Sequence, residues 1–521
     1  MSPKPYLTKH KCFLLLLLIL SLLALHLTCT LHSSSHRLLP QFNGHLSRNS
    51  HRNLRELPSW YKFLANKFID RKMRIGLVNV KFQGGLLHEE NVDMIYVNFQ
   101  HVSEKIEWDH LFPGWIDEDN VMGPHECPTI PIPDLEKYKK LDVVVARVPC
   151  GRNSTRDVYR LQVNLIVANL LVKCGWNNHD VHQTGYAVFI GECEPMFEIF
   201  RCNDLLWHQK DVRIYKPSLT KLKQKLVMPV GSCQLARPFA EQGKEIWRRY
   251  GLIEAKRRIY KPREAYVTVL HSSEAYVCGA ITLAQSIIQS NSTRDLILLA
   301  DSSISPKSLR ALQEAGWKIK PIQRIRSPHA KNRAYNEWNY SKLKIWEQLT
   351  EYEKAMFVDS DVVVFKNMDE FFVYPELSAA QNHGHLFNSG VMIVEPSKCA
   401  FEALMEKRHD VVSYNGGDQG FLNEMFAWWH RLPMRVNRLK IFTGASGNQH
   451  ALPEDVYAIH YLGLKPWKCS QDYDCNWDKV AYQKFASDSA YRRWRQVYNK
   501  MPEGLREFCA PTPKVDREFK A

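Results

Sequence analysis

The chain has 521 residues, of which 45% are hydrophobic and 11% aromatic, and its formal net charge is +15. This length provides for two or three domains, and the apolar content excludes a disordered protein. The positive balance favours an anionic partner.

The first predicted element in chain order is a membrane segment. The residues from Cys12 to Cys29 are apolar apart from three side chains, and lysines but no acidic residues precede them. We therefore expect a cytosolic tail at 1–11, a signal-anchor transmembrane helix at 12–30 and a lumenal remainder, as in a single-pass type II membrane protein. A cleaved signal peptide is the alternative, although the apolar run lacks a clear A-x-A site. Nucleic acid is not expected as a partner behind such an anchor.

A stem and a first folded region are predicted next. Residues 31–58 lack hydrophobic periodicity and are predicted to form a flexible stem. Residues 59–258 are expected to form an α/β region, because strand-like runs alternate with a long helical pattern. The strands are predicted at 73–80, 141–147 and 186–190, and the helix at 158–174. This region contains no catalytic signature, so its role stays open.

A second α/β region is predicted at 259–478, with a C-terminal helix and tail at 479–521. A basic stretch, 244–263, leads into it. Strands and helices alternate there, which predicts βαβ units and a parallel sheet whose ligands bind beyond the carboxyl ends of the strands. Strands are predicted at 265–270, 296–300 and 317–325, and helices at 275–290, 306–315, 340–349 and 481–500.

Cysteine usage agrees with an oxidising lumen. Of the 13 cysteines, two flank the membrane segment, which leaves an odd number, so at least one should lack an intrachain partner. Cys469 and Cys475 are a candidate local disulfide, and the absence of a C-x-x-C pair disfavours a zinc module. Sequons for N-glycosylation begin at Asn153, Asn291 and Asn339, the last of them close to the candidate site described next.

The run from Phe357 to Phe365 carries Asp359 and Asp361 inside an otherwise apolar stretch. It is predicted to be a buried strand of the parallel sheet, with both carboxylates at its end. Ionised aspartates are rarely buried unless they are paired or bind a cation. The pattern therefore indicates a hard divalent metal with oxygen ligands. Such a metal suits an enzyme that acts on a sugar nucleotide, where it would bridge the carboxylates to the leaving diphosphate.

Three polar motifs accompany this acidic pair. Residues 387–391 (FNSGV) precede an apolar strand and offer a small polar turn to a sugar, and residues 415–420 (NGGDQG) open a helix with hydrogen-bonding side chains. Residues 460–467 (HYLGLKPW) place an imidazole near a glycine and a lysine. Each turn alone is more often a helix cap, and a lone histidine is more often structural. Together with a carboxylate pair, they predict a third metal ligand and a cation for phosphate.

In the order of these motifs the sequence resembles glycosyltransferase family 8, over roughly residues 265–470, and it is similar to the glycogenin-like subfamily. The signal anchor, the long N-terminal region and the version of the motif that begins with Asn415 are most similar to the plant glucuronosyltransferases that substitute xylan in the Golgi. The resemblance implies a GT-A fold, that is, a Rossmann-like mixed sheet flanked by helices, here preceded by the N-terminal α/β region at 59–258. It also implies Mn²⁺ dependence and retention of anomeric configuration.

Carried over to matching positions, the resemblance assigns Asp359, Asp361 and His460 as metal ligands and Lys342 as a residue needed for activity. Asp418 and Gln419 are the candidates for orienting the donor sugar. By the same resemblance, the donor would contact the three metal ligands, Asp418 and Gln419. It would also contact further positions in the regions expected to bind uridine, the sugar and the diphosphate. The further positions are Leu270, Ser272, Ser273, Tyr276, Arg333, Ser360, Asn388, Ser389, Gly390, Asn415, Gly416, Gly417, Tyr461, Leu462, Gly463, Leu464 and Lys465.

Three departures from glycogenin bear on the expectation. Residues 430–456 contain no tyrosine, although glycogenin glucosylates its own tyrosine shortly before the metal-binding histidine. Glycogenin also has aspartate at the position of Asn415. An aspartate there would repel a donor with a C5 carboxylate, so asparagine favours UDP-glucuronate over UDP-glucose. The loop that carries Lys465 is one residue shorter than that of glycogenin.

The predicted function is therefore transfer of glucuronic acid from UDP-glucuronate to xylan at the Golgi membrane, in a possible complex with other xylan-synthesis proteins. Retention is compatible with front-face attack or with a covalent intermediate, and no residue decides between them. Two alternatives stay open. The first is a UDP-glucose or UDP-galactose transferase that acts on another glycan. The second is a catalytically silent scaffold of a polysaccharide synthase complex, which the intact metal triad disfavours.

Overall fold

The computed structural model describes residues 58–69, 71–81, 92–112, 128–138, 140–150, 155–176, 185–231, 263–444 and 450–509. These residues belong to one compact unit that begins at Pro58. The predicted tail, the membrane anchor at 12–30, the stem up to residue 57 and all but the last residue of the basic stretch 244–263 lie outside them. Within the described ranges, no helix is both long and apolar enough to cross a membrane.

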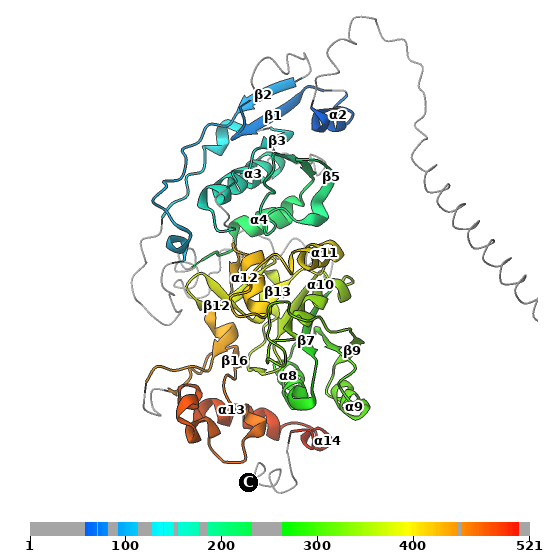
Figure 1. Cartoon of the computed structure of the whole chain (residues 1–521), viewed down its shortest axis with the longest axis vertical. Helices are drawn as coiled ribbons and strands as arrows, with labels where there is room; N and C mark the ends of the chain where they lie inside the picture. The colour runs from blue at the N-terminus through cyan, green and yellow to red at the C-terminus, as the bar shows by residue number, and fades with distance from the viewer. Residues whose placement is uncertain are drawn as a thin grey trace, which may run out of the picture. The chain divides into compact units, whose positions relative to one another are not determined.

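The N-terminal region folds around a six-stranded mixed sheet (Figure 1). Its strand order is β2-β1-β3-β4-β6-β5, and β2, β1, β3 and β4 run parallel whereas β6 and β5 pair antiparallel. The strands are β1 (Met73–Val78), β2 (Val92–Tyr96), β3 (Val143–Ala146), β4 (Tyr186–Ile190), β5 (Leu205–Gln209) and β6 (Val212–Tyr215). The helices of the region are α2 (Ser59–Ala65), α3 (Val158–Trp176) and α4 (Leu219–Val227).

The sequence predicts β1, β3, β4 and α3, which are the apolar and buried elements of this region. The strands β2, β5 and β6 were not predicted. β2 and β5 bury few of their side chains, so they show no apolar run. β6 is short and is held by pairing with β4 and β5, a contact that no local pattern reports.

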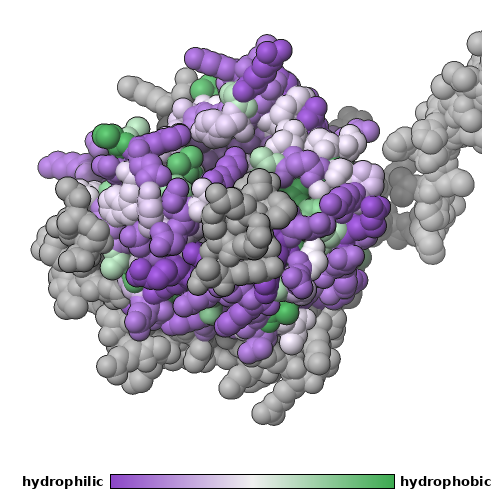
Figure 2. Space-filling view, turned by 90° about the horizontal axis from the view of Figure 1, so that it is seen from below, coloured by the Kyte–Doolittle hydropathy of each residue, from purple (hydrophilic) through white to green (hydrophobic). Residues whose placement is uncertain are grey.

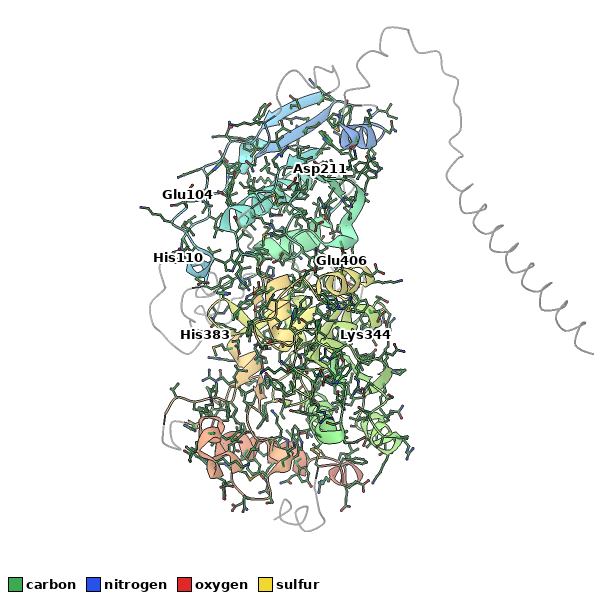
Figure 3. The ribbon with its side chains drawn as sticks, in the orientation of Figure 1. Glu104, His110, Asp211, Lys344, His383 and Glu406 are labelled. Atoms are coloured by element: carbon green, nitrogen blue, oxygen red, sulfur yellow. A yellow bond between two sulfur atoms is a disulfide. The ribbon has the colours of Figure 1, made fainter. Side chains whose placement is uncertain are left out.

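The second region is built on a seven-stranded mixed sheet with the order β14-β12-β13-β10-β7-β8-β9. The strands β10, β7, β8 and β9 run parallel, and β13 pairs antiparallel with both β10 and β12. Figure 3 shows the labelled His383, at the end of β12, and Lys344, at the start of α10, to the left and right of the central strands. The strands are β7 (Glu264–Leu270), β8 (Asp295–Ala300), β9 (Lys318–Pro321), β10 (Lys354–Val358), β12 (Ser378–His383), β13 (Leu386–Val394) and β14 (His430–Arg431).

Both faces of this sheet are covered, which explains its continuous apolar strands. Ala355 and Phe357 of β10 belong to the same buried cluster as the side chains of α3, so the two regions share a core. Met356 and Val358 face the opposite side and belong to a second cluster with α8 and α13. The helices of this region are α8 (Val277–Gln289), α9 (Pro306–Glu314), α10 (Lys344–Gln348), α11 (Lys398–Lys407), α12 (Asp418–Met425), α13 (Asp488–Asn499) and α14 (Glu503–Arg506).

The predicted strand from Phe357 to Phe365 is two strands in different sheets. β10 ends at Val358, and β11 (Val362–Val364) begins a three-stranded sheet with β16 (Ala458–His460) and β15 (Arg438–Leu439). The acidic pair therefore lies in the turn between β10 and β11, where Val362 N–H donates to Asp359 O over 3.0 Å. The carboxylates are incompatible with the buried sheet and mark the point where the chain leaves it.

Three further boundaries differ from the prediction. The predicted helix 340–349 begins as a 3-10 helix, η5 (Asn339–Leu343), before α10. The predicted helix 481–500 is interrupted because Ser487 caps α13 by accepting from Ala490 N–H, and a 3-10 helix, η11 (Val480–Phe485), precedes it. The strand expected at 317–325 is limited to β9. The face around these C-terminal elements is mainly hydrophilic, with scattered apolar side chains (Figure 2).

Disulfides connect distant parts of the unit. Cys202–Cys399 joins the N-terminal region to α11, and Cys278–Cys509 joins α8 to the segment after α14. Cys150–Cys193 lies within the N-terminal region. The predicted Cys469–Cys475 bridge is confirmed. So is the expectation of a leftover thiol, since Cys174 is buried without a disulfide partner.

Candidate active site

Asp359, Asp361 and His460 meet beyond the carboxyl end of β10. Each offers a ligand atom, and these atoms all lie within 4.8 Å of one another; among the described residues this is the one such group that could hold a metal ion. His460 Nε2 is 3.3 Å from Asp361 Oδ1, with the imidazole 7% and the carboxylate 13% exposed. Two carboxylates and an imidazole are ligands suited to a divalent cation such as Mn²⁺. The residues present therefore fit the predicted metal.

A buried amide that the sequence pattern did not single out orients the imidazole. Asn437 Oδ1 lies 3.2 Å from His460 Nδ1, and Asn437 Nδ2 donates to Asn388 Oδ1 over 2.9 Å. The amide oxygen is placed to accept from Nδ1–H, the tautomer that leaves Nε2 for a metal. Asn437 carries no motif and precedes His460 by 23 positions, so no local signal could have identified it.

Two glycines allow the turn and the imidazole to approach their neighbours. The predicted polar turn 387–391 is not a turn, since these residues lie within β13. A Cβ at Gly390 in this strand would lie 2.4 Å from His460 Cε1 and 2.7 Å from its Nδ1. A Cβ at Gly279 in α8 would lie 2.2 Å from the backbone oxygen of Ser360, inside the acidic turn. Gly390 was predicted as a sugar contact, and its position shows that it makes room for His460, the predicted third metal ligand.

Lys342 connects the metal group to the predicted sugar loops. Its Nζ is 2.6 Å from Asp418 Oδ2 and 3.5 Å from Asp359 Oδ1, and it also reaches Ser389 Oγ over 3.3 Å. Ser389 Oγ in turn donates to Asp418 Oδ2 over 2.8 Å. Burial would lower the pKa of Lys342, but the carboxylates of Asp359 and Asp418 outweigh it and raise the pKa. Lys342 is therefore a buried, permanently protonated cation.

The predicted sugar loop 415–419 forms the turn before α12. Asn415 Oδ1 accepts from Gly417 N–H at 3.0 Å and from Gly420 N–H at 3.1 Å, so it caps the start of the helix. Gly416 takes a positive φ of 69° in this turn. Gln419 Oε1 accepts from the backbone N–H of Ser389 over 3.2 Å, which ties the start of α12 to β13. The amide oxygen of Asn415 is thus occupied by the loop itself.

The carboxyl end of α12 is held by the N-terminal region. Arg156 contacts both carboxylate oxygens of Glu424 at 2.7 and 2.8 Å and the backbone oxygen of Asn423 at 3.0 Å. Asn423 in turn pairs with both backbone groups of Phe387 in β13, directly before Asn388. Arg156 lies 268 positions before Glu424, so only the folded chain reveals this support of the site.

Lys465 reaches the acidic pair instead of remaining in open solvent. Its Nζ is 2.6 Å from Asp361 Oδ2 and 2.7 Å from the backbone oxygen of Tyr461. Burial would raise the pKa of Asp361, but Lys465 and His460 reverse that effect and hold the pKa below its usual range. For Asp359, burial raises the pKa and Asp361 adds to the shift, while Lys342 opposes it. The pair therefore has one strongly acidic and one less acidic carboxyl group.

The remaining predicted positions of the 460–465 loop shape this loop mainly through their backbone groups. Tyr461 is buried, and its hydroxyl donates to Ala490 O over 2.8 Å, so this side chain points to α13 and away from the metal group. Leu462 N–H donates to His460 O at 3.0 Å, and Leu464 N–H donates to Asn476 Oδ1 at 2.8 Å. Gly463 has a φ of +80°, which favours glycine.

The turn after β7 carries the positions expected at uridine. Ser272 has a φ of 71°, and its N–H faces Asp301 Oδ2 at 3.4 Å, while Ser273 Oγ caps the next 3-10 helix. Arg324 lies 3.6 Å from Asp301 Oδ2 and donates to Ser272 Oγ over 3.4 Å. Asp301 and Arg324 were not predicted, because each is a single charged residue outside any motif.

Tyr276 is the aromatic residue among the expected uridine positions. It is 37% exposed and packs edge-on against Trp467, with ring centroids 5.9 Å apart. Lys465 Nζ lies 5.9 Å from the centroid of the same ring. Leu270 is buried at the end of β7. Arg333 is exposed, with a φ of 61°, and its N–H donates to Glu337. Tyr276 therefore joins the expected uridine positions to the lysine of the diphosphate end.

Two family models match the chain. The GUX1-5 N-terminal domain matches residues 48–233, and glycosyl transferase family 8 matches residues 267–376. The first match covers most of the region for which the sequence offered no role. The second contains Lys342, Asp359 and Asp361.

Relatives from Arabidopsis thaliana match both regions. The putative UDP-glucuronate:xylan alpha-glucuronosyltransferase 4 is 48% identical over 476 residues, which are 89% of this chain and 84% of the relative. The UDP-glucuronate:xylan alpha-glucuronosyltransferase 2 is 46% identical over 477 residues, which are 89% of this chain and 79% of the relative. Among solved structures, galactosyltransferase LgtC with donor and acceptor sugar analogs covers 47% of this chain and 99% of its own, at 16% identity and a TM-score of 0.35. That structural likeness is too weak to support a statement about this chain.

Proposed function

The chain belongs to glycosyltransferase family 8, and from this membership we propose that it transfers glucuronic acid from UDP-glucuronate to the backbone of xylan. The observation that carries the proposal is the 46% identity to a UDP-glucuronate:xylan alpha-glucuronosyltransferase across 89% of the chain. The group of Asp359, Asp361 and His460 supports an active enzyme, because a silent protein has no need for three convergent metal ligands.

We propose that Asp359, Asp361 and His460 hold Mn²⁺. The bound ion supplies Lewis-acid stabilisation of the negative charge on the departing diphosphate. Asn437 supports this role, because its amide oxygen is placed to accept from Nδ1–H and so to leave Nε2 for the ion. Lys465, which lies within 2.6 Å of Asp361, adds a second positive charge at the same end of the site.

We assign the donor sugar to the side of Lys342 that lies away from the metal ligands. Asp418 and Gln419 stand at the start of α12, tied to Ser389 and Lys342, and we propose that they orient the sugar beneath the acceptor hydroxyl. The protonated Lys342 offsets the charge of both Asp359 and Asp418 in a buried site. The transfer is proposed to retain the anomeric configuration, as the family resemblance implies.

The proposed location is the Golgi membrane, with a type II anchor at residues 12–30 and the catalytic unit in the lumen, beside other xylan-synthesising proteins. Four disulfides among the described residues agree with an oxidising compartment. The sequon at Asn291 is exposed, as a glycan would require. N-terminal sequencing of the mature protein tests the anchor: a start near residue 30 would replace it with a cleaved signal peptide.

The decisive assay combines the purified lumenal part, Mn²⁺, a panel of UDP-sugars and xylo-oligosaccharides. We expect a product that is heavier than the acceptor by one glucuronosyl unit, and dependence of UDP release on both donor and acceptor. Preference for UDP-glucose or UDP-galactose would overturn the donor assignment. Failure of every donor to give product would favour the scaffold role.

A further inference from the structure

Large apolar side chains are exposed on two loops beside the donor-sugar loops. Tyr335 is 86% exposed, and on the loop that leads into α12 Val412 is 71% and Tyr414 is 50% exposed. Exposed aromatic rings on a soluble surface often mark a binding site for a ligand with an apolar face. The mechanism proposed above uses none of these side chains.

The two loops are bonded to each other next to these rings. Asn336, which follows Tyr335, donates from Nδ2 to the backbone oxygen of Asn415, which follows Tyr414, over 2.6 Å. A Cβ at Gly416 would lie 3.0 Å from the backbone oxygen of His329, so the loops are also in close contact there. Tyr335 and Tyr414 are therefore presented by neighbouring, mutually fixed turns.

Tyr414 is also attached to the catalytic centre. Gln419 Nε2 donates to the Tyr414 hydroxyl over 2.6 Å, while Gln419 Oε1 accepts from Ser389 N–H. This contact holds the phenol at the edge of the donor-sugar loops and leaves half of the side chain exposed. A ligand that covers the Tyr414 ring would thus lie next to the sugar to be transferred.

The chemistry of this surface suits the acceptor better than the donor. The donor is an anion, and its charged part is matched by the cations of Lys342 and Lys465. An uncharged phenol ring instead suits the apolar C–H face of a neutral pyranose. We propose that Tyr414 and Tyr335 form an acceptor platform, on which Tyr414 covers the xylose unit nearest Gln419 and Tyr335 covers a unit farther along the xylan chain. The proposal rests on the proposed function and names the residues that would bind its acceptor.

The test compares Tyr335→Ala and Tyr414→Phe with the wild type and with Tyr96→Ala, in the full lumenal unit. Tyr96→Ala is the control, because Tyr96 is 50% exposed like Tyr414 but lies on β2 of the N-terminal sheet. Initial rates are measured with UDP-glucuronate while the length of the xylo-oligosaccharide is varied. Tyr335→Ala should raise the acceptor KM about tenfold for long oligosaccharides, with a smaller effect on short ones and a donor KM close to that of the wild type.

Tyr414→Phe keeps the ring but loses the bond to Gln419, so we expect a lower kcat with a nearly unchanged acceptor KM. An unchanged acceptor KM in Tyr335→Ala, or an equal rise in Tyr96→Ala, would overturn the platform. These results are distinguishable from failure of the proposed function, in which the wild type itself would transfer no glucuronic acid to any of the oligosaccharides.

Discussion

Replacement of Asn415 by aspartate changes the charge of the donor site while its shape is retained. The amide oxygen accepts from Gly417 N–H and Gly420 N–H at the start of α12, and a carboxylate oxygen would accept the same two bonds. A negative charge at a helix N-terminus is itself favourable, by about 0.3–1 kcal/mol. We therefore expect Asn415→Asp to fold normally, with an unfolding free energy equal to or slightly above that of the wild type.

The new oxygen takes the place of Asn415 Nδ2, and its effect on the donor follows from Coulomb's law. Asn415 is half-buried, so an effective dielectric constant of about 20–40 applies. For a donor carboxylate bound on the order of 6 Å from the new oxygen, the repulsion would be about 1–3 kcal/mol, with water screening part of it. A repulsion of that size corresponds to a loss of about one to two orders of magnitude in kcat/KM for UDP-glucuronate.

The assay compares UDP-glucuronate and UDP-glucose with both proteins at a fixed Mn²⁺ concentration. UDP-glucose has no carboxylate and should lose much less activity in the variant. Asn98→Asp is the control, because Asn98 is exposed after the end of β2 in the N-terminal region. Equal losses for the two donors would refute the reasoning and leave Asn415 with its capping role alone.

Three further predictions concern the metal, the buried histidine and the support of α12. Asp361→Ala should abolish transfer with a largely unchanged circular dichroism spectrum, and wild-type turnover with Mn²⁺ present would contradict the metal assignment. Burial lowers the pKa of His430 from 6.5 to about 3, so the unfolded state binds the proton first and stability falls as pH drops from 6.5 towards 3. Chemical denaturation should show that the unfolding free energy decreases by up to about 1.4 kcal/mol per pH unit because of this residue. His430→Gln should flatten this pH dependence, and an unchanged slope would show that His430 is protonated in the folded state. Arg156→Gln should cost about 1–3 kcal/mol of unfolding free energy and lower kcat through α12. Lys137→Gln, which breaks an exposed pair with Asp134, should cost less than about 1 kcal/mol, and equal thermal shifts would argue against a special role for Arg156.

The fold could be predicted where local pattern and burial agree. β7, β8 and β10 are apolar on both faces because helices and the N-terminal region cover both sides of the sheet, and the sequence shows them as continuous hydrophobic runs. The prediction failed for strands such as β5, whose side chains are largely exposed. It also joined β10 to β11, because nothing in an apolar run tells which sheet each half enters.

The chemistry of the site was determined by the sequence itself. Asp359 and Asp361 stand out because charged side chains in a buried run require a partner, and His460 and Lys465 stand in a motif whose order is visible without coordinates. These residues are rare in such surroundings, so their identity carries information about function that is independent of the fold.

Only the tertiary structure decided how those residues are held. Asn437 contacts the His460 imidazole, Gly390 makes room for its ring, and Arg156 supports α12 from the N-terminal region. Amides, glycines and single arginines are common throughout the sequence, and their roles depend on contacts across 23 to 268 positions. Such contacts arise from packing between elements, which no local pattern of residues encodes.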